Sequence, residues 1–268
     1  MKRKIGINCD CVQGIDSLDA LELIKTVGFD CFFTGSELTD FDKIARIKEK
    51  GDKLGLSYEF IHAPFKNVNS MWNEDENTKP FMKSIFQSID NASGNGVPAI
   101  ILHASSGWNY PTITDEGFAR YDELVAYGES KKVIIAFENM RTAPNYTALL
   151  ERYKNNPYAR YCYDNGHEHC WAPEVPHIEK YGDRMCCTHL HDNFGKLENY
   201  LSVDGDLHLL PFDGNFDYES MICRMDQCGY TGSLTLEVFN DKKAEYMALS
   251  AEDFFRTAYE RLKKISEM

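Results

Sequence analysis

The sequence lacks several features that would assign it to common functional classes. It has no apolar run long enough to cross a bilayer, so no transmembrane segment is expected. The opening MKRKIGINCD has basic residues but no apolar stretch after them, so no signal peptide is expected. Neither a GxGxxG motif nor a P-loop occurs, which argues against a nucleotide cofactor. Because linker-like and low-complexity segments are also missing, residues 1–268 are predicted to form one domain.

Positive charge is scarce. The chain has 29 Lys and Arg against 42 Asp and Glu, a formal net charge of −13. A nucleic-acid-binding surface is normally basic, so nucleic acid is not an expected partner. A small anionic substrate stays open, because a bound divalent metal reverses the local field.

Disulfides are not expected either. The nine cysteines are odd in number. A free thiol in an apolar strand behaves as a small hydrophobe. Most of the cysteines occur in such strand-like contexts: Cys9, Cys31, Cys162, Cys186 and Cys187. The sequence therefore predicts a reduced, cytoplasmic protein, and it leaves assembly into a homo-oligomer open.

Short apolar runs alternate with amphipathic segments along the whole chain. The runs predict strands at about 4–10, 31–35, 56–65, 98–106, 133–140, 159–167, 184–193 and 233–239. The amphipathic segments predict helices at about 17–28, 40–55, 77–96, 114–131, 145–156, 173–183, 217–230 and 252–267. Strict alternation of eight strands with eight helices predicts an α/β fold, a (β/α)₈ TIM barrel with a parallel sheet.

Metal-ligand residues recur at the carboxyl ends of the later strands. Glu138, Asp164, His189 and Glu237 each end one of the four last runs. Neighbouring strand ends meet on the face of a barrel where active sites form. A single carboxylate there is usually a helix cap or an ion-pair partner. Four polar side chains buried at successive strand ends without compensating partners would be costly. We therefore predict one divalent-metal site with three carboxylates and one imidazole, suited to Mn²⁺, Mg²⁺, Co²⁺ or Fe²⁺, with Zn²⁺ also compatible.

Further histidines surround this site in the sequence. His62 and His103 end the third and fourth strands, and His167 follows Asp164 by three residues. Asp206 and His208 lie in a long polar loop at about 194–216. In the run THLHDN, His189 and His191 point the same way from the strand, because side chains alternate with a period of two. His189 lies deeper and is the favoured ligand, with His191 as a supporting or substrate-contacting residue.

The ordered strand ends HAP, LHAS, FEN, YDNGH, HLHDN and LEVF, with the Asp-x-His, resemble the xylose isomerase-like barrel superfamily. The resemblance extends from the third predicted strand to the eighth. It implies a sugar isomerase or epimerase that holds one metal on Glu138, Asp164, His189 and Glu237. Glu138 and Glu237 would also be the acid and base that move a proton through a metal-stabilised enediolate. His167 and His208 would contact the substrate.

One loop departs from the superfamily pattern. Where relatives usually read Pro-Gly-x-Gly, this chain reads Pro211-Phe212-Asp213-Gly214. The resemblance also implies that His62 and His103, which precede this loop in the sequence, line the pocket. His191, near the rim of the seventh strand, and Trp108 and Arg141, in loops after strands, are added as candidate substrate contacts.

Other functions remain open at the level of sequence. The same superfamily contains a zinc-dependent apurinic endonuclease with three zinc ions, and this chain has a residue for each of its nine ligands. These are His62, His103, Glu138, Asp164, His167, His189, Asp206, His208 and Glu237. The acidic charge and the absence of a Lys or Arg cluster on the relevant loops argue against DNA as the substrate. A keto-inositol dehydratase type of lyase starts with the same proton abstraction, and a non-enzymatic binding protein is least favoured.

Overall fold

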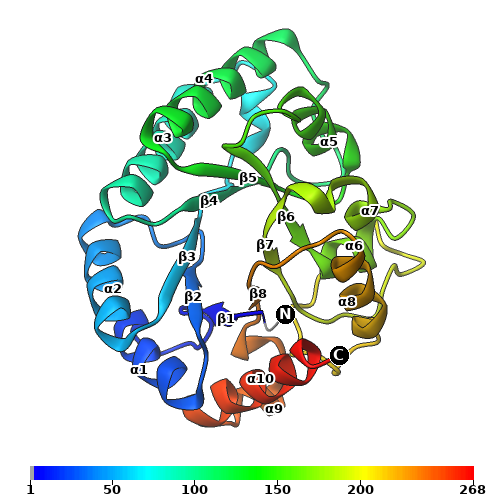
Figure 1. The fold of residues 1–268 in the computed structure, drawn as a ribbon. Helices are drawn as coiled ribbons and strands as arrows, with labels where there is room; N and C mark the ends of the chain where they lie inside the picture. The colour runs from blue at the N-terminus through cyan, green and yellow to red at the C-terminus, as the bar shows by residue number, and fades with distance from the viewer. Residues whose placement is uncertain (1–2) are drawn as a thin grey trace.

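Eight parallel strands form the centre of the computed structural model, which describes residues 3–268 (Figure 1). Hydrogen-bonded neighbours follow the order β7-β6-β5-β4-β3-β2-β1-β8. At the remaining seam, the Leu190 N–H donates to the Thr235 carbonyl at 2.8 Å and the Glu237 N–H to the Leu190 carbonyl at 3.0 Å. The strands are β1 (Ile5–Asn8), β2 (Cys31–Thr34), β3 (Ser57–His62), β4 (Ala99–Leu102), β5 (Ile134–Glu138), β6 (Ala159–Asp164), β7 (Met185–His189) and β8 (Leu234–Leu236). The predicted (β/α)₈ barrel is confirmed: the sheet is nearly closed.

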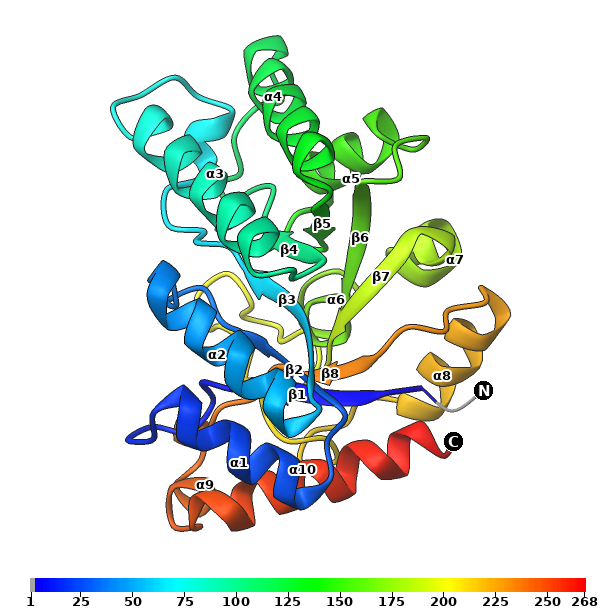
Figure 2. The same ribbon diagram turned by 60° about the vertical axis from the view of Figure 1, so that its left-hand side comes forward.

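Helices surround the strands on the outside of the barrel (Figure 2). Several begin after a capping side chain, as at α4, where the Thr114 hydroxyl accepts from the Gly117 N–H at 3.0 Å. The helices are α1 (Ser17–Val27), α2 (Phe41–Leu54), α3 (Thr78–Gly94), α4 (Asp115–Lys131), α5 (Ala143–Arg152), α6 (Asn165–Trp171), α7 (His177–Tyr181), α8 (Tyr218–Gln227), α9 (Ala244–Met247) and α10 (Ala251–Ser266). Short 3₁₀ turns are η1 (Val68–Met71), η2 (Gly182–Arg184) and η3 (Asn240–Lys242).

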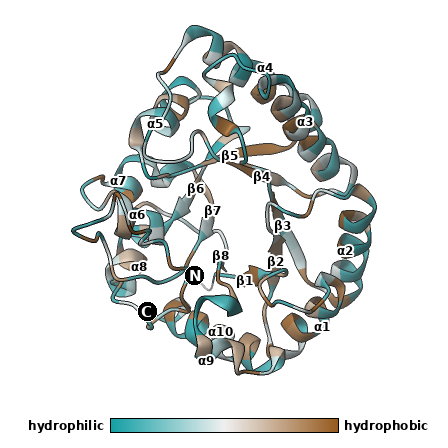
Figure 3. Ribbon diagram, turned by 180° about the vertical axis from the view of Figure 1, so that it is seen from behind, coloured by the Kyte–Doolittle hydropathy of each residue, from teal (hydrophilic) through white to brown (hydrophobic). Residues whose placement is uncertain are grey.

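Two apolar layers hold the strands in place. Inside the barrel, Phe33, Phe60, Ile101, Ala136 and Cys162 pack in one buried cluster. Between the strands and the helices, a larger cluster fills the space around the barrel. In Figure 3 the strands β4 and β5 are brown and the surrounding helices carry long teal stretches. This pattern explains why the strands read as continuous apolar runs: both of their faces are covered.

The region after β6 differs from the sequence prediction. The strand was expected to reach residue 167, but it ends at Asp164 and α6 begins at once. The Asp164 carboxylate caps this helix by accepting from the His167 N–H at 2.7 Å. The predicted helix at 173–183 is shorter as well, with Pro176 at the N-cap of α7 and η2 completing the segment. His167 therefore lies on a helix rather than on a strand.

All nine cysteines lie within the described residues and carry free thiols. Seven of them have raised thiol pKa values, in most cases chiefly because burial disfavours the thiolate. Across residues 3–268, no helix is both long and apolar enough to span a membrane.

Candidate metal centre

The four predicted metal ligands converge at the carboxyl ends of β5 to β8. Glu138, Asp164 and His189 are the last residues of β5, β6 and β7, and Glu237 directly follows β8. The Nδ1 atom of His189 lies 3.0 Å from Glu138 Oε1 and 3.5 Å from Glu237 Oε2. It lies 4.0 Å from Asp164 Oδ2. Four side chains from four neighbouring strands thus share one small volume.

The donor atoms fit a divalent metal. Atoms that bind one ion at roughly 2.1 Å lie about 3.0–3.5 Å from each other, from octahedral to tetrahedral geometry, and the two shorter contacts of His189 fall in this range. Asp164 Oδ2 is fully buried and has no hydrogen-bond partner among residues 3–268. A bare buried carboxylate oxygen is costly, so its position favours a cation nearby. Three carboxylates and one imidazole suit hard or borderline ions such as Mg²⁺ and Mn²⁺.

The four side chains divide into two that reach a cavity and two that do not. Glu138 and Glu237 line a cavity of about 420 Å³ at this face of the barrel. Asp164 and His189 are fully buried and are not among the lining residues found in the described chain. Two ligands therefore lie behind the cavity wall, while two carboxylates line it; of these two, Glu138 is fully buried and Glu237 is 9% exposed.

His62 and His103 form a second cluster with Glu138. The Nε2 atoms of His103 and His62 lie 2.9 Å and 3.6 Å from Glu138 Oε2, the oxygen that does not face His189. His62 donates its Nδ1–H to the Ala63 carbonyl at 2.8 Å, so its Nε2 carries the lone pair in the neutral ring. Both rings also line the cavity. Glu138 consequently presents one oxygen to each cluster.

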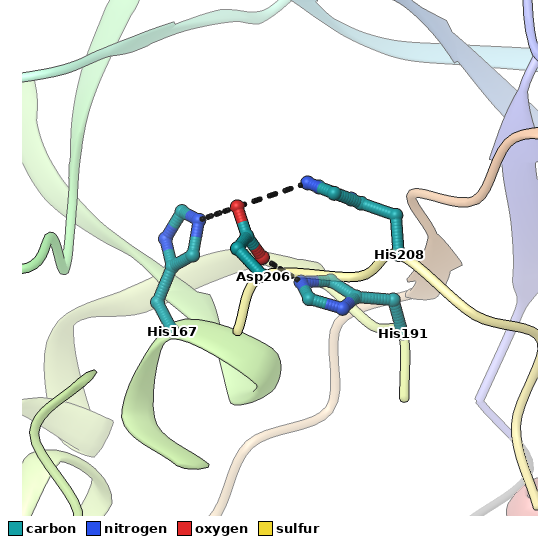
Figure 4. Close-up of side chains that lie close together, drawn as sticks. All are labelled: His167, His191, Asp206 and His208. Carbon is teal, nitrogen blue, oxygen red and sulfur yellow. Dashed lines mark hydrogen bonds and ion pairs between the residues drawn. The ribbon is translucent and has the colours of Figure 1, made fainter. Parts of the chain in front are cut away.

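A third cluster surrounds Asp206 (Figure 4). Asp206 Oδ2 lies 3.4 Å from His167 Nε2 and 3.2 Å from His208 Nε2, and Oδ1 lies 3.3 Å from His191 Nε2. Two elements bring these residues together: α6 carries His167, and the β7–α8 loop (residues 190–217) carries His191 near its start and Asp206 and His208 further along. All nine residues of the predicted three-metal set therefore lie in three adjoining clusters.

Negative charge at the centre changes the protonation of the histidines. Burial disfavours the charged ring of His189, but the carboxylates of Glu237 and Glu138 outweigh burial and raise its pKa to about 10. Burial also disfavours the charged rings of His167 and His208, but nearby carboxylates outweigh it. Asp164 is the main cause that raises the pKa of His167 to about 10, and Asp206 the main cause that raises the pKa of His208 to about 9. In the absence of another cation, protons on these rings balance the buried carboxylates.

Three predicted substrate contacts occupy different positions. Arg141 lines the cavity, with its guanidinium carbon 4.3 Å from the centre of the Trp171 ring, and it pairs with Asp204 of the β7–α8 loop. Trp108 packs behind Arg141 at 5.8 Å and against Tyr200, and the cavity lining of the described chain does not include it. His191 is fully buried and is also outside that lining.

Asp10 and Trp171 are among the residues of the cavity wall that sequence reasoning missed. Asp10 lies just beyond β1 and accepts from the Gly35 N–H at 3.1 Å. Burial, together with the nearby Glu237, raises the pKa of its carboxyl. The rule that selected the other strand ends would have found Asp10. The ring of Trp171 stacks on that of His167 at 4.1 Å, one turn further along α6. A predicted helix starting at residue 165 would have placed Trp171 on the same face as His167.

The loop that departs from the superfamily pattern keeps a glycine-like path. Phe212, at the position of the missing glycine, has a φ of 72°, in the left-handed region. Its N–H donates to Asp192 Oδ2 at 2.8 Å, and the Phe216 N–H donates to Oδ1 at 3.1 Å. The buried Asp192 carboxylate therefore holds the loop in shape although the glycine is absent.

Fold and site together identify the class. A sequence model of the xylose isomerase-like TIM barrel family matches residues 21–265, and the chain belongs to this family. The family predicted from the strand ends is thus confirmed.

Individual relatives extend the comparison. The chain is 29% identical over 194 residues to an uncharacterized protein of Sinorhizobium fredii, covering 67% of this chain and 58% of the relative's length. It superimposes on a D-tagatose 3-epimerase-like protein with a TM-score of 0.74, at 20% identity and 98% coverage of both chains. It also superimposes on the D-allulose 3-epimerase of Methylomonas sp. in complex with D-allulose, with a TM-score of 0.73, 16% identity and coverages of 98% and 97%. These structural likenesses show the fold, which is that of sugar epimerases.

Proposed function

We propose that the protein is a divalent-metal-dependent isomerase or epimerase of a sugar or a related polyol ketone. The observation that supports this most is the placement of Glu138 and Glu237. Both carboxylates lie beside His189 Nδ1, both line one cavity, and they come from non-adjacent strand positions, β5 and β8. Such a pair suits removal of a proton from one side of a substrate carbon and its return from the other.

The chain's own residues account for most of this chemistry. A divalent ion held by Glu138, Asp164, His189 and Glu237 would supply Lewis acidity to the carbonyl and hydroxyl oxygens of the substrate. Asp164 and His189, fully buried, hold position, while Glu138 and Glu237 face the cavity and exchange the proton. Phe65, stacked on His103 at 4.6 Å, offers an apolar face to sugar C–H groups and excludes water.

Within the broader class of sugars and sugar phosphates, the charge of the cavity supports a neutral, hydroxyl-rich substrate. Arg141 is the one Lys or Arg among the cavity-lining residues of the described chain, and Asp204 already pairs with it. Carboxylates attract hydroxyl donors and repel phosphate, so this lining favours an uncharged ketose. Five carboxylates line the same space: Asp10, Glu37, Glu138, Asp206 and Glu237.

Hydrogen exchange with solvent tests the proposal on many candidate substrates in the same way. The protein, loaded with Mn²⁺ or Co²⁺ and then freed of excess ion, is incubated in D₂O with a panel of neutral ketoses and keto-inositols. We expect deuterium to enter one ketose at a carbon next to the carbonyl, with formation of its epimer or aldose isomer, as followed by NMR. Formation of a dehydrated product instead would indicate the lyase. Absence of both exchange and elimination across the panel would refute the proposal.

Phosphoester hydrolysis is the second candidate, and the two additional clusters favour it. His62 and His103 at Glu138, and His167 and His208 at Asp206, supply donors for more than one ion. Closely spaced metals bind both the attacking and the leaving oxygen of a phosphoester.

Elemental analysis of protein purified without chelator separates the candidates. One Mg, Mn, Co or Fe ion per chain, retained through gel filtration, supports the isomerase, with or without a single zinc ion at the Asp206 cluster. Three zinc ions per chain, with cleavage of a model phosphodiester or abasic DNA, would replace it by the hydrolase.

A further inference from the structure

We propose that His167, His191, Asp206 and His208 form a closed, four-ligand zinc site that fixes the β7–α8 loop across the cavity. In this site His191, which lies outside the nine ligands implied by the resemblance, is the fourth ligand. The inference concerns the architecture of the cavity wall and does not depend on the proposed proton transfer.

The spacing of the donor atoms matches four-coordinate zinc. Zinc binds imidazole nitrogen and carboxylate oxygen at about 2.0–2.2 Å, so tetrahedral ligand atoms lie about 3.3–3.5 Å apart. The carboxylate oxygens of Asp206 lie 3.2–3.4 Å from the Nε2 atoms of the three histidines. All four donor atoms lie within 4.8 Å of one another. Figure 4 shows the three rings directed at the same carboxylate.

Backbone carbonyls fix the orientation of two of these rings. His167 donates its Nδ1–H to the Asn139 carbonyl at 2.8 Å, and His208 donates its Nδ1–H to the Glu237 carbonyl at 3.0 Å. In the neutral rings, both Nε2 lone pairs therefore face Asp206. A lone pair repels a carboxylate, so this arrangement requires either a proton on each Nε2 or a metal ion in its place. The same arrangement, with one ring nitrogen on a carbonyl, orients most metal-binding histidines.

His191 is the least satisfied member of the cluster. Its side chain is fully buried, and neither ring nitrogen has a hydrogen-bond partner within residues 3–268. Its ring stacks on that of His208 at 4.1 Å, and its Nε2 lies 3.3 Å from both Asp206 Oδ1 and Asp164 Oδ1. An unpartnered buried imidazole is costly, and a metal ion is the partner that the surrounding donors can also bind.

The ligand set also predicts what this ion would do. Three imidazoles and one carboxylate favour zinc over Mg²⁺ or Mn²⁺, in contrast to the oxygen-rich site of Glu138, Asp164 and Glu237. A site with four protein ligands is structural, because no position is open for water. The ion would tie the middle of the β7–α8 loop to its first residues, at His191, and to α6, at His167. That loop also carries Asp204, the partner of Arg141 at the cavity, so the ion would set the position of this wall.

Substitution of the fourth ligand tests the proposal. The metal-free full-length protein and H191N are titrated with Co²⁺ and Zn²⁺, and bound metal, the visible Co²⁺ spectrum and proteolysis within 190–217 are measured. We expect H191N to bind one ion fewer per chain, or to bind it at least about 100-fold more weakly. We also expect it to lose the intense tetrahedral Co²⁺ bands and to be cleaved faster in the loop. His169→Asn is the matched control for bound metal and the Co²⁺ spectrum, because His169 is a neighbouring α6 histidine outside the cluster; since it contacts Asn215 of the loop, it does not serve as the control for proteolysis.

A second variant keeps the test independent of folding. If H191N does not fold, as judged by circular dichroism, D206N replaces it, because Asp206 lies on the loop and is not a ligand of the first site. Unchanged metal binding and an unchanged Co²⁺ spectrum in the folded variant would overturn the proposal. His191 would then be a bridge between two carboxylates. Because metal binding rather than turnover is measured, the result is distinct from failure of the proposed isomerase.

Discussion

Replacing Glu237 by Gln lowers kcat by about 10²–10⁴-fold, the usual contribution of a positioned acid or base, while KM changes less than tenfold. Gln keeps an oxygen that can bind a metal, but it cannot accept a proton. Glu237 is the ligand with the greatest access to the cavity, at 9% exposed, so its role in proton transfer should exceed its role in holding the ion. Turnover and deuterium incorporation are measured on the ketose found by the exchange experiment.

A carboxylate at the cavity rim provides the control. Glu37 lines the same cavity, but it is exposed and belongs to no candidate metal cluster of the described residues. E37Q should therefore keep kcat within a few-fold of the original. If E237Q lost metal and substrate binding as severely as turnover, Glu237 would be a ligand without a role in proton transfer.

Replacing Gly166 by Ala destabilises the protein by about 1–3 kcal/mol, the typical effect of overpacking, and displaces His191. A Cβ at Gly166 would lie 1.9 Å from Cε1 and 2.3 Å from Nε2 of the His191 ring. The backbone there has little freedom, because Asn193 Nδ2 donates to the Gly166 carbonyl at 3.0 Å and Asp164 caps the same helix. The free energy of unfolding is measured by urea denaturation.

Gly94→Ala is the matched control, since Gly94 also lies in a helix, at the end of α3. Its added Cβ would meet only the tip of the Phe41 ring at 3.0 Å, and Phe41 is 46% exposed and can move. Ala in place of Gly in a helix is favourable by about 0.5–1 kcal/mol, so this change should be neutral or stabilising. Equal stability of G166A and G94A would mean that His191 is mobile enough to move aside, which would weaken the case for a fixed cluster.

The barrel and the strand-end residues could be predicted because one signal controls both. Apolar runs such as VIIAFENM are long enough to identify a buried strand, and a polar residue at the end of the run marks the catalytic face. Glu138, Asp164 and His189 followed directly from this rule. Asp10 follows the same rule but was missed. The apolar run before it is short, and Asp10 lies between Cys9 and Cys11, which favour interpreting this segment as part of the apolar core.

Contacts between elements distant in sequence could not be predicted. The end of β6 was placed three residues late, because YDNGH fits both a strand end and a helix start; the choice depends on whether Asp164 caps a helix. Likewise, the spacing of His189 and His191 shows that they share a direction, but not that one meets Glu138 and the other meets Asp206. Such contacts depend on the path of the β7–α8 loop, which is held by Asp192 rather than by a local motif.

Asp164 contacts residues of both the first cluster, around His189, and the third cluster, around Asp206. Its Oδ2 atom faces His189, while its Oδ1 atom accepts from the His167 N–H and lies 3.3 Å from His191. Any shift of this carboxylate toward an ion of larger radius would pull on the first turn of α6 and on the second group of ligands at the same time. The pair of sites should consequently select ions jointly by size, and loading of one site should alter the affinity of the other.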